Sequence, residues 1–158
     1  MIYLLEQVFR PAIQALNWVD KYGGVVTKYN DPKTNEVYPI VAFNSDPMCS
    51  ETDPYTPITP DDAFKSVVYW EQAGATRIDS SERRYVTGTT TMRFVAWIKP
   101  KKQGVTPVYG LSSIYANDFV SRVNSVQGAT VSGVLVTLSV TRASITEVDE
   151  SAVFGYYS

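Results

Sequence analysis

Two runs of strand-forming residues, separated by a short polar segment, occupy the middle of this chain. The stretch from Phe64 to Ile98 reads FKSVVYWEQAGATRIDSSERRYVTGTTTMRFVAWI. It is rich in β-branched and aromatic residues, which favour strands, and the polar DSSE in its middle favours a turn. We therefore predict a long β-hairpin. Each of its strands would be at least twice the usual length of about five or six residues.

The order of residues in the second run indicates which part of the hairpin is buried. Side chains alternate between the two faces of a strand. One face then carries Val86, Met92, Phe94, Ala96 and Ile98, and the other carries Tyr85, Val95 and Trp97. Both faces are apolar near Trp97, so we expect that end to be buried on both sides. The polar part, residues 77–84 and 87–91, should project into water or against a partner, because an isolated two-stranded ribbon is at best marginally stable in water.

The first helix is expected at residues 2–20, where apolar residues recur at helical spacing. Pro11 lies within this segment and cannot donate a backbone hydrogen bond, so we expect a kink there. Gly23 and Gly24 should then end the helix, because paired glycines favour turns.

A second helix is expected at residues 112–127. Ser112 or Ser113 is suited to the N-cap, and Gly128 is suited to the position that ends the helix. The apolar residues of this segment share one face: Leu111, Tyr115, Phe119, Val123 and Val126. That face is suited to packing on a sheet.

Two more strand regions complete the chain. Residues 25–29 and 37–43 form a small hairpin around the turn-forming NDPKTNE, and residues 131–145 form a closing strand. The whole chain, residues 1–158, then forms one α+β domain: an antiparallel sheet with a long hairpin and helices packed on one face. The residues expected in the core beneath these helices are Phe94, Trp97, Phe119 and Leu138.

Charge is distributed unevenly, although the net charge of the chain is only −2. Residues 44–62 form a long loop with four prolines, and residues 46–62 of this loop contain five acids and no base. Residues 65–102 contain eight bases and three acids, a net charge of +5. Loops longer than about 12–15 residues are usually functional or disordered. The acidic loop and the basic hairpin are therefore either solvated surface or two surfaces that meet between subunits, where opposite charges set orientation.

The sequence contains no histidine and one cysteine, Cys49. Histidine is the commonest general base and the commonest metal ligand, so a Ser-His-Asp triad, a Cys-His pair and a Cys/His zinc site are excluded. Gly23, Gly24 and Gly104 lack the spacing and partner residues of a phosphate-binding loop. No apolar run approaches the ~18 residues of a membrane helix. We therefore expect no enzymatic activity, no cofactor and no membrane association.

Three other kinds of site stay open. The carboxylates of residues 46–62 could bind calcium, although they match no calcium-loop spacing. A pair of acids could serve glycoside hydrolysis, for which any acidic chain offers candidates. The long hairpin interleaves arginines with aromatic residues, as single-strand nucleic-acid binders do, but a pI of about 5.1 argues against a nucleic-acid-binding domain.

A succession of helix, short hairpin, long hairpin, helix and strand spans nearly the whole chain. Its segments are IYLLEQVFRPAIQALNWVD, VVTKY with VYPIVAFN, the long hairpin, GLSSIYANDFVSRVNSV and SGVLVTLSVTRASI. This succession resembles that of the small ring-forming proteins of tailed bacteriophages, the tail terminators and the head–tail joining (neck ring) proteins. NWVDKYGG near the start and AVFGYYS at the end are similar to ring proteins of crAss-like phages.

The resemblance implies a structural protein of the virion neck or tail, made in the host cytoplasm. Identical subunits would form an oligomeric ring that joins other neck, tail or portal proteins. Genomic DNA would pass through the lumen during ejection, without sequence recognition. The alternative is a ligand- or glycan-binding module of a virion or cell surface without catalysis, which requires an aromatic cleft in the monomer.

A head-to-tail ring joins two different surfaces of each subunit. The predicted pair of surfaces is the basic end of the long hairpin and the acidic loop or C-terminal tail, residues 146–158. Charge would orient this contact, and apolar residues would supply most of its affinity. The predicted contact residues are Arg77, Arg83, Arg84, Met92, Arg93, Asp53, Tyr55, Asp61, Asp62, Phe154 and Tyr156.

Overall fold

The computed structural model describes residues 2–30, 32–33, 35, 37–41, 63–81, 85–104 and 111–137. Its helices are α1 (Ile2–Gln14) and α2 (Leu111–Asn124), with a short 3-10 helix, η1 (Pro100–Gln103). The strands are β1 (Lys21–Asn30), β2 (Val37–Val41), β3 (Ser66–Gln72), β4 (Arg77–Ser81), β5 (Val86–Thr89), β6 (Met92–Ile98), β7 (Gly128–Val131) and β8 (Val134–Thr137). This combination of helices and sheets confirms the α+β class.

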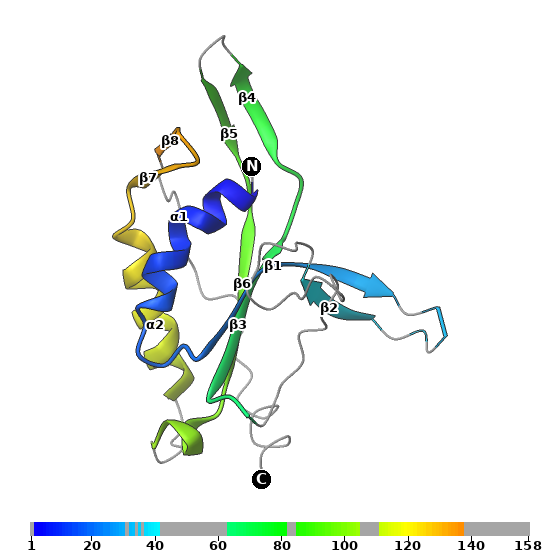
Figure 1. Cartoon of the computed structure of the whole chain (residues 1–158), viewed down its shortest axis with the longest axis vertical. Coiled ribbons are helices and arrows are strands. Elements are labelled where there is room, and N and C mark those ends of the chain that lie inside the picture. The colour runs from blue at the N-terminus through cyan, green and yellow to red at the C-terminus, as the bar shows by residue number, and fades with distance from the viewer. Residues whose placement is uncertain are drawn as a thin grey trace.

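A four-stranded sheet in the order β2-β1-β3-β6 lies at the centre of the molecule (Figure 1). β1 pairs antiparallel with β2, and β3 pairs antiparallel with β6, as predicted. β1 and β3 are parallel, so the sheet is mixed rather than wholly antiparallel. Parallel neighbours need a long connection between them, and β2 is part of that connection here.

The predicted long hairpin is confirmed. β3 and β6 pair over all seven residues of each strand. Beyond them the N–H of Ala73 donates to the carbonyl oxygen of Thr91 at 3.0 Å, and β4 and β5 continue the hairpin with a bulge at Asp79. Figure 1 shows this outer part extending past the helices.

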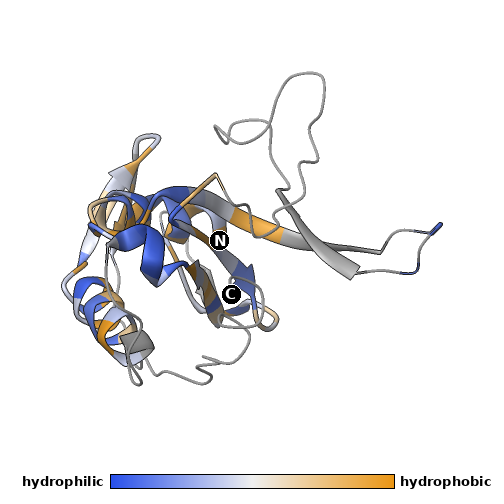
Figure 2. Cartoon of the chain, turned by 90° about the horizontal axis from the view of Figure 1, so that it is seen from below, coloured by the Kyte–Doolittle hydropathy of each residue, from blue (hydrophilic) through white to orange (hydrophobic). Residues whose placement is uncertain are grey.

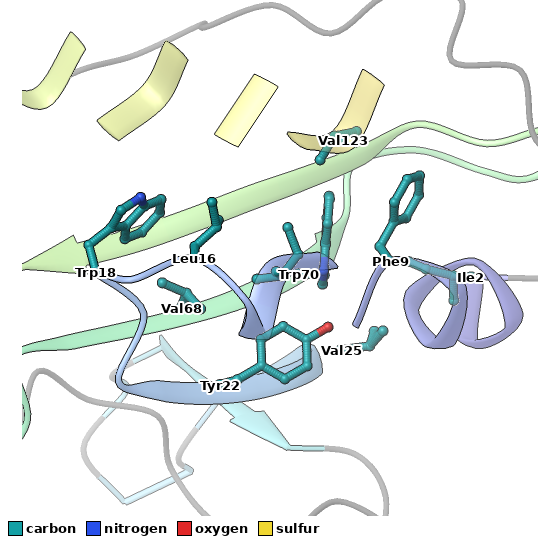
Figure 3. Close-up of a cluster of buried hydrophobic side chains, with 10 residues drawn as sticks. Ile2, Phe9, Leu16, Trp18, Tyr22, Val25, Val68, Trp70 and Val123 are labelled. Carbon is teal, nitrogen blue, oxygen red and sulfur yellow. The ribbon is translucent and has the colours of Figure 1, made fainter. Parts of the chain in front are cut away.

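The main core lies between the sheet and the two helices (Figure 3). The ring of Trp70 lies 5.6 Å from Phe9 of α1, 5.0 Å from Phe94 of β6 and 5.7 Å from Phe119 of α2, between centroids. The rings of Phe94 and Phe119 stack at 4.0 Å. The buried residues of this cluster are Ile2, Phe9, Ile13, Leu16, Trp18, Tyr22, Val25, Val68, Trp70 and Val123. The predicted positions of Phe94 and Phe119 beneath the helices are confirmed.

The other face of the sheet carries a smaller apolar cluster. Val26, Val67 and Tyr69 are buried there, and Phe64, Val95 and Trp97 pack against them. The predicted position of Trp97 beneath the helices is therefore wrong. Trp97 shares a strand face with Val95, whereas the helices cover the face that carries Phe94. The prediction of apolar packing on both faces near Trp97 is confirmed.

α1 is shorter than predicted: it ends at Gln14, and a turn follows. Pro11 lies within α1, and in Figure 1 the first and last turns of this helix run in different directions, as expected where proline removes a backbone hydrogen bond. The prediction that Gly23 and Gly24 end the helix is wrong, because both lie within β1. Gly24 has a φ of 64° at the point where β1 shifts register against β3, a backbone conformation that glycine adopts readily.

α2 presents the predicted apolar face to the core. Tyr115, Phe119 and Val126 pack against the core, and Val123 is buried within it. The helix begins at Leu111, so Ser112 and Ser113 lie in its first turn rather than at the N-cap. It ends at Asn124, and Gly128, which was predicted to end it, begins β7. Figure 2 shows hydrophilic and hydrophobic segments along both helices, as expected of amphipathic helices.

The prediction of a single closing strand at residues 131–145 is wrong at the N-terminal end of that segment. β7 and β8 form a hairpin, and its two turn residues are Ser132 (φ 48°) and Gly133 (φ 79°). Two consecutive residues with positive φ are typical of a type I′ turn, whose twist suits a two-residue hairpin. This hairpin packs against α1. Residues 138–145, the predicted loop at 44–62 and the tail at 146–158 lie outside the described residues.

Candidate functional site: the projecting arm

The outer part of the long hairpin, consisting of β4, Tyr85 and β5, is called the arm (Figure 1). All four residues of β5 are exposed. No described residue of the arm belongs to either apolar cluster of the sheet. The arm therefore contributes surface to the molecule and little to its buried core.

One face of the arm is polar. Nε of Arg77 lies 2.9 Å from Oδ1 of Asp79, and the hydroxyl of Thr89 donates to Oδ2 of Asp79 at 3.2 Å. At the base of the arm the hydroxyl of Thr76 donates to the hydroxyl of Thr90 at 3.1 Å. The Arg77 side chain is 82% exposed, so this ion pair contributes little to stability. It holds the charged groups of this face in a defined direction.

The opposite face of the arm is apolar. Ile78 lies across the ladder from Gly88, and Val86 lies on the same side of the ribbon because it is two residues from Gly88. Glycine has no side chain to cover a cross-strand neighbour, and Ile78 is 63% exposed and Val86 53% exposed. Tyr85, next to β5, is also exposed, at 61%, but it is adjacent to Val86 and so falls on the other side of the ribbon by alternation. Large apolar side chains that gather on an exposed surface are typical of an interaction site.

The structure places three of the predicted contact residues. Arg77 is exposed on the arm, as predicted. Arg93 lies at the base of the arm on β6, with its Nη1 3.6 Å from Oε2 of Glu71 in β3. Met92 lies on β6 rather than on the arm, and it is half-buried and packs against the core beneath the helices. The other predicted contact residues lie outside the described part of the chain: Arg83, Arg84, Asp53, Tyr55, Asp61, Asp62, Phe154 and Tyr156.

The sequence pattern alone does not reveal the apolar face of the arm, because residues 77–84 and 87–91 have a polar composition and alternation groups Val86 with Met92 and Phe94 rather than with Ile78. Part of the signal is present in β5, where Val86 and Gly88 alternate with Thr87 and Thr89. The position of Ile78 on the same face depends on the ladder and on the bulge at Asp79. A bulge adds a residue to one strand and changes which side chains share a face.

A buried charged cluster lies between α1 and β1. Glu6 is 2% exposed and accepts hydrogen bonds from Nε of Arg10 at 2.8 Å, from Nη2 of Arg10 at 3.0 Å and from the Tyr22 hydroxyl at 2.6 Å. Burial, followed by the charge of Glu6, raises the pKa of Tyr22 far above its ordinary value. The Glu6 carboxylate is fully engaged by structural partners, so this cluster supports the core rather than a reaction.

Trp70 of β3 interacts with this cluster through its indole Nε1, which affects the pKa of Tyr22. This nitrogen is buried and has no hydrogen-bond partner among the residues that the structure describes. Figure 3 shows it pointing toward the Tyr22 hydroxyl, an orientation that lowers the pKa of Tyr22 without reversing the increase caused by burial. The indole therefore contributes packing and a dipole, and leaves no open polar site in the core.

Other kinds of site receive no support from the described residues. Within them, no group of three or more acidic or cysteine side chains is placed to hold a metal ion. The acidic residues 46–62, which were considered for calcium, lie outside this part of the chain. No described helix is long and apolar enough to cross a membrane. The rings of Trp70, Phe94 and Phe119 pack against one another in the core, so these three rings do not line an open aromatic cleft.

Comparisons with protein-family models, with curated proteins and with solved structures found no match to this chain. The arm offers apolar surface and oriented charges, which are features of a binding surface rather than of a reactive centre.

Proposed function

We propose that this protein is a structural subunit of an oligomeric ring in the neck or tail of a tailed bacteriophage, either a head–tail joining protein or a tail terminator. The observation that carries the proposal is the arm, a two-stranded ribbon with exposed apolar side chains and no described role in the core. Such a ribbon is at best marginally stable alone in water. A neighbouring subunit is the surface that best accounts for its length and its apolar face.

The order of elements supports the same proposal. α1, the β1–β2 hairpin, the long hairpin and α2 follow one another as in the ring proteins that the sequence resembles. The β7–β8 hairpin departs from that order, because the resemblance implies a single closing strand.

In such a ring, the arm of each subunit lies against a different surface of the next subunit. Head-to-tail contacts of this kind close into a ring when the rotation between neighbours permits it. Ile78 and Val86 supply apolar area to the contact, at about 25 cal/mol for each Å² removed from water. Arg77 and Asp79 set the orientation of the contact through charge. The lumen of the ring is the passage for DNA, which is contacted without sequence recognition.

The mass of the purified protein by light scattering, together with negative-stain imaging, tests this function. We expect closed rings of uniform size. A monomer at all accessible concentrations contradicts the proposal. A monomer that binds a glycan or a small ligand favours the binding-module alternative.

Two matched substitutions test whether the arm makes the ring contact. Ile78→Glu places a charge on the apolar face of the arm, and Ile114→Glu makes the same change on α2 at nearly equal exposure, 63% against 62%. We expect Ile78→Glu to weaken each contact at least tenfold, which corresponds to about 1.4 kcal/mol. Because every contact of a ring carries the substitution, closed rings should be lost. Ile114→Glu should leave the rings intact. Equal effects of the two substitutions would show that the arm does not make the ring contact.

A further inference from the structure

In the described part of the chain, β6 lies at one edge of the central sheet. β6 is the last strand in the order β2-β1-β3-β6, and no strand in the described part of the chain pairs with its far side. An edge of this kind presents backbone N–H and C=O groups with which another strand can pair. Arg93 and Ala96 are exposed and the other residues of β6 are half-buried, so the helices do not enclose this strand.

The two edges of the sheet differ in their capacity to pair. β2, at the opposite edge, contains Pro39, which has no N–H and interrupts the hydrogen-bonding pattern available to a further strand. β6 contains no proline and pairs with β3 without a bulge. A single charge, Arg93, interrupts its apolar sequence MRFVAWI. The β6 edge therefore lacks most of the features that prevent pairing between edges.

We propose that the β6 edge pairs antiparallel with the β6 edge of a second copy of this chain, about a twofold axis at Val95. In this register the two copies of Val95 lie opposite each other. The remaining cross-strand pairs are Phe94 with Ala96, Met92 with Ile98 and Arg93 with Trp97. The two four-stranded sheets then form one continuous sheet across the axis.

The side chains of β6 complement one another in this register. On the face beneath the helices, the bulky Phe94 meets the small Ala96. On the other face, the only charge of the strand, Arg93, meets the indole of Trp97, an arrangement that favours a cation–π contact. The Arg93 side chain is 58% exposed and Trp97 is half-buried, so both have surface left for a neighbour. This fit argues for a second copy rather than for an unrelated strand.

Neighbouring registers are less favourable. An axis at Ala96 places Arg93 opposite Lys99, and like charges that lie opposite each other destabilise a strand pair. An axis at Phe94 leaves Trp97 opposite Thr91 and shortens the apolar overlap. The axis at Val95 is the one that pairs all seven residues of β6 with each other.

The β6 contact is distinct from the head-to-tail contact of the proposed ring. Neighbours in a cyclic ring face the same way, whereas twofold partners face opposite ways. The β6 contact therefore joins two rings, or forms a dimer where no ring exists. The two proposals can fail separately.

Cross-linking through a single introduced thiol tests the register. The variant is Val95→Cys in a Cys49→Ser background of the full chain, so that only the residue at the proposed axis carries a thiol. Directly opposite residues in an antiparallel pair have Cβ atoms about 4.5–5.5 Å apart, close enough for mild oxidation to join them with a small backbone adjustment. We expect a covalent dimer as the main product under non-reducing conditions, with the melting temperature of the reduced variant close to that of the parent.

The matched control is Ala96→Cys in the same background. In the proposed register, the two copies of residue 96 are displaced along the strands to about 8 Å, beyond the ~7 Å limit for a disulfide without backbone movement. We expect this variant to form little covalent dimer on oxidation. Failure of Val95→Cys to cross-link, as when another segment of the same chain already occupies the edge, overturns the proposal. Equal cross-linking of both variants overturns the register and with it the proposal.

An exchange of residues tests the Arg93–Trp97 pair. In the Val95→Cys background, Trp97→Arg places two arginines opposite each other and should lower the cross-linking rate at least threefold. Adding Arg93→Trp restores an arginine opposite a tryptophan and should recover most of that rate. A double variant no faster than the single one contradicts the proposed pairing. If the wild type forms rings but Val95→Cys does not cross-link, only the β6 contact is overturned. If Val95→Cys cross-links but the wild type forms no rings, only the proposed function is overturned.

Discussion

The two ends of the long hairpin share a continuous pairing of strands and differ in what covers them. At the sheet end, Val68 is 0% exposed and Trp70 is 4% exposed, because the helices pack on their face. At the arm end, Ile78 is 63% exposed and Val86 is 53% exposed. Strand pairing is present in both, so apolar burial is what separates the end that stabilises the fold from the end that is free to bind.

This difference predicts which substitutions in the hairpin affect the stability of the fold and which affect assembly. Changes at the sheet end should lower the free energy of unfolding and affect assembly only through folding. Changes at the arm end should leave the free energy of unfolding nearly unchanged and act on assembly directly. The predictions below test that division, from the largest expected change in stability to the smallest.

Trp70→Ala should cause the largest loss. It removes the ring that contacts Phe9, Phe94 and Phe119 and leaves a cavity, at a cost of about 3–5 kcal/mol. Urea unfolding followed by circular dichroism measures this loss. The control is Tyr85→Ala on the arm, which should change the free energy of unfolding by less than about 0.5 kcal/mol. Comparable losses in the two variants would show that the arm shares the burial of the core.

Glu6→Ala should cause an intermediate loss. It leaves the buried Tyr22 hydroxyl without its acceptor and removes the partner of Arg10, at a cost of about 1–3 kcal/mol. The Arg10 side chain is 29% exposed and can turn toward water, which limits the loss. Glu6→Gln keeps an acceptor for Tyr22 and should cost less when measured by the same urea titration. If Glu6→Gln were the more damaging change, the cluster would depend on charge rather than on hydrogen bonding.

Tyr22 should make stability fall at alkaline pH. Its folded pKa is raised, mainly by burial and then by Glu6, so the folded state keeps the phenol proton when the unfolded state loses it. The stabilisation is fully present below the unfolded pKa of about 10 and is lost above it, by up to about 1.4 kcal/mol per pH unit. Tyr22→Phe should flatten this decline between pH 9 and pH 11, about one unit on each side of that pKa. Tyr85→Phe, the same substitution at an exposed position, is the matched control for the loss of a hydroxyl.

Residue alternation was sufficient to predict the two faces of β6 in the long hairpin. Phe94 and Trp97 were correctly assigned to opposite faces of β6, since side chains alternate along a strand. Which face the helices cover was not determined by alternation, because both faces are apolar there. That choice depends on where α1 and α2 pack, and this is why the predicted burial of Trp97 beneath them is wrong.

The hairpin of β7 and β8 was predicted as part of one strand because its turn is not evident from composition. Ser132 and Gly133 separate β7 from β8, but they lie within a run of valines that has the composition of one strand. Only the positive φ of both residues shows the turn.

The parallel pairing of β1 with β3 joins segments far apart in the chain, and no local pattern specifies such a neighbour. At the candidate site, Arg77 was predicted from its charge, whereas the apolar face of Ile78 and Val86 depends on the bulge at Asp79.

Removing the arm should cause the largest change in assembly with only a small change in stability. Residues 77–89 are replaced by a two-residue Asn-Gly turn between Thr76 and Thr90, whose hydroxyls already lie 3.1 Å apart. The mass in solution and negative-stain images are then compared with those of the intact chain. We predict a free energy of unfolding within about 1 kcal/mol of the parent and no rings, only monomers or pairs joined through β6. Closed rings of unchanged size from the armless chain would contradict the account.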